Sequence, residues 1–149
     1  MWIALGIIFA LPVFVLALLS LTASLPHRVG THHGRLAECP DSPNCVCSQS
    51  ENPAHHVEPI PFDVSVEEAR DRLKQILGQM PRTTIVSESD GYLRAECRSR
   101  VFRFVDDLEF VFDDRSKPIH IRSASRAGYG DLGVNRQRVE MIRKVWQRR

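Results

Sequence analysis

The stretch Val64–Cys97, VSVEEARDRLKQILGQMPRTTIVSESDGYLRAEC, decides the fold, because it joins a helix pattern to a hairpin pattern. In its first half, apolar residues recur at helical spacing: Val66, Ala69, Leu73, Ile76, Leu77 and Met80. Ser65 and Glu68 form a capping-box pair, so we expect a helix over 65–77 that ends before Pro81. Asp90-Gly91 then separates two strand-like segments, 83–88 and 92–97, and predicts a tight β-hairpin.

The pattern continues downstream of the hairpin. Segments 101–105, 108–112 and 119–125 alternate as strands do, and 135–147 carries the apolar stripe of a second helix. The pair Asp106-Asp107 is expected in a turn between two of these strands. The order predicts an α+β domain over 36–149, with an antiparallel sheet of four or five strands and two helices on one face.

The N-terminal residues carry a different signal. Residues 3–25 contain no charged side chain, and about 20 apolar residues suffice for a helix to cross a bilayer. We expect one N-terminal transmembrane helix over 1–26, followed by a linker over 27–35; a cleaved signal peptide is the alternative. Arg28 and Arg35 favour a cytoplasmic domain by the positive-inside rule. The cysteines favour the extracytoplasmic, periplasmic side, and that is our expectation.

Three of the four cysteines lie close together in the sequence Cys39-Pro-Asp-Ser-Pro-Asn-Cys45-Val-Cys47. A disulfide between Cys39 and Cys45 would close a small loop and hold a segment with little apolar content. Two alternatives stay open, namely free thiols, and a metal site that adds His55 or His56, although the spacing does not match paired zinc-binding cysteines. Cys97 is expected as a buried apolar residue, and a bond between Cys47 and Cys97 is a further option.

The C-terminal part is rich in arginine. Arg122 and Arg126 share a strand face by alternation, and Arg136 and Arg138 lie at the start of the second helix. Guanidinium groups near a helix start can bind an anion, so these four arginines form a candidate site for a phosphate, a carboxylate or a lipid headgroup. The alternative is internal pairing of the arginines with nearby acids, namely Asp106, Asp107 and Asp131, the last of which can also cap the helix.

Composition limits the function classes. The formal charge is only +2, and the chain has no basic stripe with interleaved aromatic residues, so nucleic-acid binding is not expected. The acidic residues between 106 and 114 lack the ligand order of a calcium loop. We therefore predict no metal, no cofactor and no assignable catalytic group.

Three motifs resemble a known family. They are Cys39-Pro40 through Pro43-Asn44-Cys45, then residues 104–110 (FVDDLEF), then 122–126 (RSASR) with the segment 128–138. Together they resemble the bacterial and plastid family named domain of unknown function 1499, over residues 36–146. The resemblance implies an N-terminal hydrophobic segment but no activity. It also implies that Cys39 and Cys45 are the natural pair, because the family pattern usually has serine at Cys47.

These observations predict a single-pass, membrane-anchored envelope protein that acts as a binding or assembly module. Its expected partners are the membrane, an anionic small molecule or lipid headgroup, and a second membrane protein. A thiol-based redox enzyme or a hydrolase is an alternative, as is a purely structural partner of another membrane protein.

Overall fold

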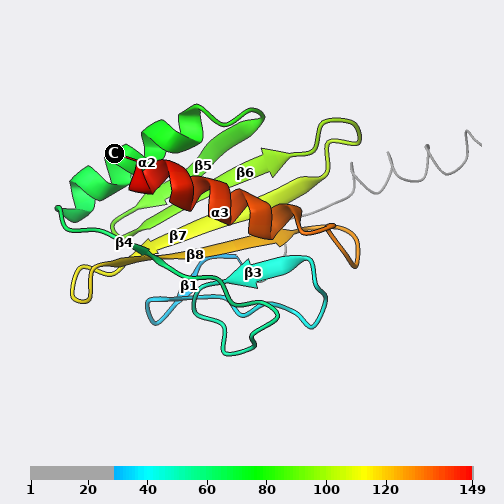
Figure 1. Cartoon of the computed structure of the whole chain (residues 1–149), viewed down its shortest axis with the longest axis horizontal. Coiled ribbons are helices and arrows are strands. Elements are labelled where there is room, and N and C mark those ends of the chain that lie inside the picture. The colour runs from blue at the N-terminus through cyan, green and yellow to red at the C-terminus, as the bar shows by residue number, and fades with distance from the viewer. Residues whose placement is uncertain (1–28, 149) are drawn as a thin grey trace, which may run out of the picture.

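The computed structural model describes residues 29–148, which form an α+β domain with one main sheet and two helices (Figure 1). The predicted anchor over 1–26 lies outside these residues. No helix within 29–148 combines the length and the apolar character that crossing a bilayer requires. The elements in chain order are β1 Thr31–His32, β2 Arg35–Leu36, β3 Cys45–Cys47, β4 Ile60–Pro61, α2 Val66–Gly78, β5 Thr83–Ser89, β6 Tyr92–Arg98, β7 Val105–Phe112, β8 Pro118–Ser125 and α3 Val134–Gln147.

The main sheet is antiparallel, with strand order β3-β8-β7-β6-β5. The short strand β4 also pairs with β8, so β3 and β4 lie one after the other along the same edge of β8. The sheet therefore has six strands, and the prediction of four or five was too low. The two extra strands come from the proline-rich part of the chain, where two- and three-residue strands leave too short an alternation to detect.

Both helices pack on one face of the sheet, which we call the front face (Figure 1). The predicted capping box is present, because the Ser65 hydroxyl accepts from the Glu68 amide while the Glu68 carboxylate accepts from the Ser65 amide. The hairpin of β5 and β6 also forms as predicted. The core lies between the layers and includes Leu73, Ile76, Leu93, Leu108, Phe110, Ile119, Ile121, Val139 and Ile142.

The start of β7 differs from the prediction. Residues 99–104 form a loop rather than a strand, and β7 begins at Val105. The pair Asp106-Asp107 lies inside β7 instead of in a turn, and Asp107 is fully buried. The sequence did not reveal this, because a buried carboxylate requires a cationic partner and the partners come from other strands and from α3.

The opposite face, which we call the back face, carries the polar residues of the strands. Strands β1 and β2 form a small hairpin, and its Leu36 packs with Cys47 and Val111 on this face. The backbone amide of Gly30 donates to a carboxylate oxygen of Glu109 on β7, at 2.7 Å. The described part of the expected linker, from residue 29 onward, is thus in contact with the folded domain.

Candidate functional site

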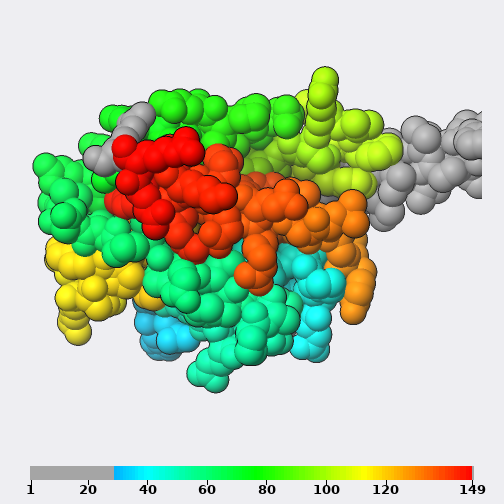
Figure 2. All heavy atoms as spheres, viewed as in Figure 1, coloured from blue at the N-terminus to red at the C-terminus, as the bar shows by residue number. Residues whose placement is uncertain are grey.

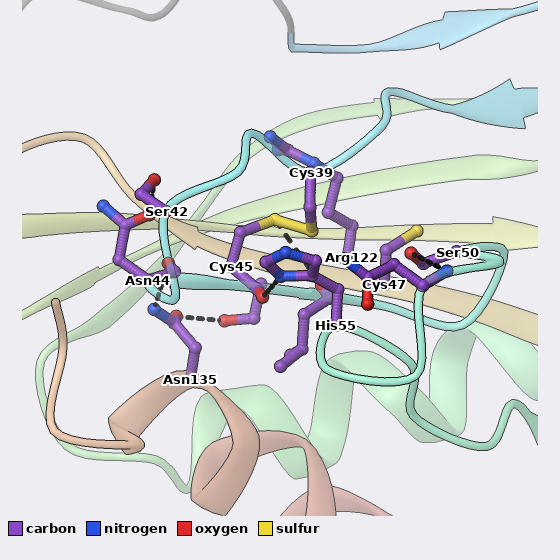
Figure 3. The surroundings of a disulfide bond; sticks show 12 residues. Cys39, Ser42, Asn44, Cys45, Cys47, Ser50, His55, Arg122 and Asn135 are labelled. Atoms are coloured by element: carbon purple, nitrogen blue, oxygen red, sulfur yellow. Dashed lines mark hydrogen bonds between the residues drawn. A yellow bond between two sulfur atoms is a disulfide. The ribbon is translucent and has the colours of Figure 1, made fainter. Parts of the chain in front are cut away.

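The motifs that carry the family resemblance meet at one end of the sheet, around the start of α3. Asn135, fully buried, connects them: its amide nitrogen donates to the Asn44 carbonyl and to the Ser125 hydroxyl, each at 3.0 Å. Figure 3 shows Asn135 reaching Asn44 in the loop that the disulfide closes. The Ser123 hydroxyl donates to the Asn135 side-chain oxygen at 2.6 Å. Every polar atom of this buried amide therefore has a partner, which fixes the helix start on the sheet.

The disulfide joins Cys39 to Cys45, with a sulfur–sulfur distance of 2.04 Å, and confirms the predicted pairing. Because both sulfurs are in this bond, they are not available as thiolate ligands for the alternative metal site. The neighbouring His55 ring is used structurally, since its Nδ1 lies 2.9 Å from the Cys45 carbonyl oxygen (Figure 3). Cys45 is 1% exposed, so the bond holds the loop against the sheet edge.

The two remaining cysteines, Cys47 and Cys97, are free and buried. They lie on opposite faces of the sheet, because Cys47 pairs with Arg122 on the back face whereas Cys97 pairs with Asp106 on the front face. The optional bond between them is therefore wrong. Burial raises the pKa of both thiols, and Arg122 near Cys47 and Arg138 near Cys97 only partly oppose this effect.

The four arginines of the predicted anion site do not converge on one point. Arg122 and Arg126 lie on the back face, as strand alternation predicts. The Arg138 side chain instead extends from α3 to the front face of the sheet, where it donates to the Ser123 hydroxyl. Arg136 points elsewhere and donates to the carbonyl oxygens of Ala54 and His56, each at 2.7 Å. The sequence could place the first two on one face, but the rotation of α3 about its axis depends on tertiary packing.

On the back face the arginines are paired with acids. Arg122 donates to Glu109 at 2.7 Å, and both side chains are almost completely buried. Arg126 donates through two nitrogens to Asp107, each at 2.8 Å, and also to Glu96 at 2.5 Å. These hydrogen bonds, first those to Asp107, raise the pKa of Arg126 further.

The other two predicted acids lie near the start of α3. Asp106 accepts from Arg138 at 2.6 Å on the front face. Asp131 accepts from the backbone amides of Gly133 and Asn135, at 2.9 and 2.8 Å, and so satisfies free donors at the helix start. Glu96 and Glu109 belong to the same network. Glu109 is one of the acidic residues between 106 and 114 noted in the sequence, whereas Glu96 was not singled out, although it alternates with Arg94 on β6.

A cleft of about 360 Å³ opens on the front face beside the start of α3. Three arginines line it, namely Arg82, Arg98 and Arg138, and no acid among residues 29–148 does. The guanidinium of Arg98 pairs with Glu96 of the back face, at 2.8 Å. Ten residues form its walls: Met80, Pro81, Arg82, Thr83, Cys97, Arg98, Val134, Gln137, Arg138 and Met141. Of the four predicted arginines, only Arg138 belongs to this cleft.

The register of the hairpin brings two of these arginines together. Thr83 pairs with Cys97, so the preceding Arg82 and the following Arg98 are adjacent, and each donates from nitrogen to the other's carbonyl oxygen, at 3.1 and 3.0 Å. Because Asp90-Gly91 sets this register, the sequence contained the signal for this arginine pair, although not for its approach to Arg138.

A second hollow, of about 520 Å³, follows the outer side of α3 and shares Gln137 and Met141 with the cleft. Its basic side chains are Arg136, Lys144 and Arg148, and Glu140 is its one acid. Glu140 is paired with Arg143 at 2.8 Å. The exposed side of α3 is therefore basic over most of its length.

These features define a class of protein: a two-layer α+β domain, stapled by one disulfide, with an ion-paired back face and a basic cleft beside its last helix. The chain belongs to the family described as "Protein of unknown function (DUF1499)", whose model matches residues 35–145. The match confirms the resemblance seen in the three motifs and includes the disulfide, the buried network and the cleft. No curated protein and no solved structure matches the chain.

Proposed function

We propose that this protein is a membrane-tethered binding module of the cell envelope, and that its domain holds an anionic group in the cleft beside α3. The observation that carries the proposal is a hollow lined by three arginines, Arg82, Arg98 and Arg138, and by no acid within residues 29–148. Guanidinium groups bind carboxylate and phosphate oxygens in a planar, two-pronged geometry.

The charges around the cleft leave a positive excess. Arg138 is held in place by Asp106 beneath it, and Arg98 is half exposed and shares Glu96 with Arg126. Arg82 is exposed, and its side chain makes no ion pair within residues 29–148. Asp106 pairs with Arg138 alone, whereas Glu96 is shared by Arg98 and Arg126, and Arg82 has no acid partner within residues 29–148. The positive excess is therefore at Arg82, where an incoming anion meets a favourable potential.

The apolar residues in the walls of the cleft indicate which chemical group the ligand carries besides its anionic group. Val134 is 45% and Met141 is 39% exposed, and with Met80 they contribute apolar surface to the same cleft as the arginines. A ligand that joins an anionic head to an apolar body fits both surfaces. The lipid headgroup and the anionic small molecule expected from the sequence share this chemistry.

Anchoring in the membrane is the second part of the proposal, and the uncharged run over residues 3–25 supports it. The disulfide favours the extracytoplasmic side, since such bonds persist in oxidising compartments. Resistance of the full chain to alkaline extraction from membranes tests the anchor. Release into the aqueous fraction contradicts it.

The cleft is tested by thermal unfolding of the full chain in mild detergent, with increasing inorganic phosphate at constant ionic strength. A bound ligand raises the melting temperature in proportion to RT ln(1 + [L]/Kd). We expect this rise for the native chain, and at least a tenfold weaker apparent affinity for the double variant Arg82→Asn with Arg98→Gln. Asparagine suits position 82, because its φ of +58° lies in the left-handed region that asparagine tolerates.

The matched control is Arg115→Gln, which removes an exposed arginine of the loop 113–117, outside the cleft. Its apparent phosphate affinity should stay within about twofold of the native value. If the native chain gains no stability from phosphate, or if the control loses as much affinity as the cleft variant, the cleft is not an anion site.

The redox alternative remains a separate prediction. An exchanging disulfide needs a sulfur that an incoming thiolate can reach, and Cys45 is 1% exposed while Cys39 is only half-buried. A redox pair should cycle under mild reductant without loss of structure. A structural bond, which the packing favours, should resist mild reductant or unfold the loop when it breaks.

A further inference from the structure

Three apolar side chains stand out from the rest of the surface. Leu132 is 97%, Tyr129 is 77% and Val101 is 76% exposed, and no other large apolar side chain in residues 29–148 exceeds 45%. Single exposed apolar residues are normal on protein surfaces. Several exposed apolar residues in one region instead mark a site that binds another protein or a membrane.

All three lie at the same end of the sheet. Val101 is in the loop 99–104, which joins the last residue of β6, Arg98, to the first residue of β7, Val105, and these two residues pair. Tyr129 and Leu132 are in the loop 126–133, whose first residue donates its amide to the Val105 carbonyl at 3.1 Å. Both loops therefore leave the sheet side by side.

The figures show this end plainly. In Figure 1 the loop between β6 and β7 and the loop that precedes α3 both project to the right, away from the C-terminus. Figure 2 shows the same two segments, in yellow-green and orange, as separate projections at that side of the surface. We call this surface, made of residues 99–104 and 126–133, the loop end.

The loop end is also basic. Arg100 and Arg103 are exposed and have no hydrogen-bond or ion-pair partner within residues 29–148. The acid on these loops, Asp131, is occupied by two backbone amides at the start of α3. The Phe102 and Phe104 rings lie 5.7 Å apart and are half-buried, so the basic loop packs on itself while Val101 points outward.

Apolar tips beside unpaired arginines fit one kind of partner, the interface of an anionic bilayer. Apolar and aromatic side chains enter the boundary between headgroups and acyl chains, while nearby arginines contact lipid phosphates. The tyrosine suits this position because its ring is apolar and its hydroxyl stays near water.

The length of the preceding chain agrees with this partner. Gly30 is held on Glu109, which lies four residues from Val105 along β7, or about 13 Å from the loop end. Residues 26–29 separate Gly30 from the uncharged run and can extend about 13–14 Å. The end of an anchoring helix can therefore lie level with the loop end.

We propose that the loop end rests on the surface of an anionic bilayer, with Val101, Tyr129 and Leu132 in the interface and Arg100 and Arg103 on headgroup phosphates. This inference relies on the membrane anchor of the proposed function, and not on its cleft. The cleft opens close by, because Arg98 is next to one loop and Val134 is next to the other. In this orientation a headgroup can reach the cleft.

The test uses the full chain reconstituted in vesicles of three parts phosphatidylcholine to one part phosphatidylglycerol. A nitroxide is attached in turn to Val101→Cys, Leu132→Cys and Arg115→Cys. The native free cysteines are buried, and Arg115 is exposed in the loop 113–117 at the opposite end of the sheet. We expect the first two labels to be shielded from a water-soluble relaxation agent and relaxed by oxygen, and the third to be open to the water-soluble agent.

Charge is tested in the same vesicles. Arg100→Gln with Arg103→Gln should expose the label at position 132 several-fold more, whereas Arg115→Gln with Arg148→Gln, the matched loss of two exposed arginines, should not. Equal aqueous access at positions 101, 115 and 132 overturns the proposal. So does shielding that appears only when membrane proteins are added, since that outcome assigns the loop end to a protein partner.

Alkaline extraction of each preparation measures separately whether the chain stays anchored in the vesicles. A chain that is released shows failure of the proposed anchor. A chain that stays in the vesicles with freely accessible labels overturns the loop-end proposal alone.

Discussion

Glu109 is a fully buried carboxylate whose replacement by glutamine should strongly destabilise the domain. It accepts from Arg122 at 2.7 Å, from the Tyr92 hydroxyl at 2.8 Å and from the Gly30 amide at 2.7 Å. Glutamine keeps the shape but removes the charge, and Arg122 is itself only 3% exposed. The guanidinium is then buried without a counter-charge, and its Nε already lacks a partner within residues 29–148.

Breaking a buried ion pair by removing one member costs about 3–5 kcal/mol, because the remaining charge cannot return to water. For a domain of about 120 residues this corresponds to a fall in melting temperature of roughly 12–20 °C. It is a large share of the 5–15 kcal/mol that typically stabilises a folded domain. We therefore expect Glu109→Gln to fold poorly at elevated temperature, or to unfold at much lower denaturant concentration.

The assay is urea unfolding of the full chain in mild detergent, followed by circular dichroism. Asp114→Asn is the matched control, since Asp114 is exposed and its pair with Lys117 should contribute at most about 1 kcal/mol. A second variant, Glu109→Leu with Arg122→Met, removes both charges and should recover part of the loss. If Glu109→Gln costs no more than the control, the buried pair does not hold the back face together as argued here.

Three further predictions concern other parts of the domain. Removing the disulfide with Cys39→Ser and Cys45→Ser should cost about 2 kcal/mol of unfolding free energy, from the loop-closure entropy of a six-residue separation, measured by urea unfolding. Burial lowers the pKa of His120, so the folded state disfavours its protonation; stability should fall as pH drops below about 6.5, and His120→Gln should flatten that slope in unfolding curves at several pH values. Ser65→Ala should cost about 1 kcal/mol through loss of the capping box at α2, again by urea unfolding, with no change expected for the exposed neighbour variant Asp63→Ala.

Local patterns predicted much of the fold. The helix at 66–78, the hairpin around Gly91 and the inward faces of β6, β7 and β8 all depend on residues close in sequence, so periodicity and turn chemistry sufficed. The disulfide was also within reach, because its loop is short. Strand β3 was missed because it is held in place by β8, which lies far away in the sequence.

The candidate site was harder to predict, because it depends on how elements rotate against each other. The sequence placed Arg122 and Arg126 on one face correctly, since the strand period is fixed at two residues. It could not place Arg136 and Arg138, because their directions depend on how α3 is rotated against the sheet. That rotation is set by the packing of its core-facing residues, here Val139 and Ile142. Arg82 was missed for a similar reason: the hairpin register places it beside Arg98, but its approach to Arg138 depends on how α3 is docked.

The segment Arg122–Arg126 (RSASR) shows why pairing and ligand binding coexist in one arginine-rich stretch. Alternation sends its two arginines to the back face, where Glu109 and Asp107 neutralise them, and sends Ser123 and Ser125 to the front face. There the serines hold Asn135, which sets the start of α3, and Ser123 also accepts from Arg138. A shift of one residue in β8 would exchange these two sets, bury two guanidinium groups against the apolar core and leave the helix start without its partners. The arginines of β8 therefore act in stability, and the binding proposed here falls to Arg138 and to the arginine pair supplied by the neighbouring hairpin.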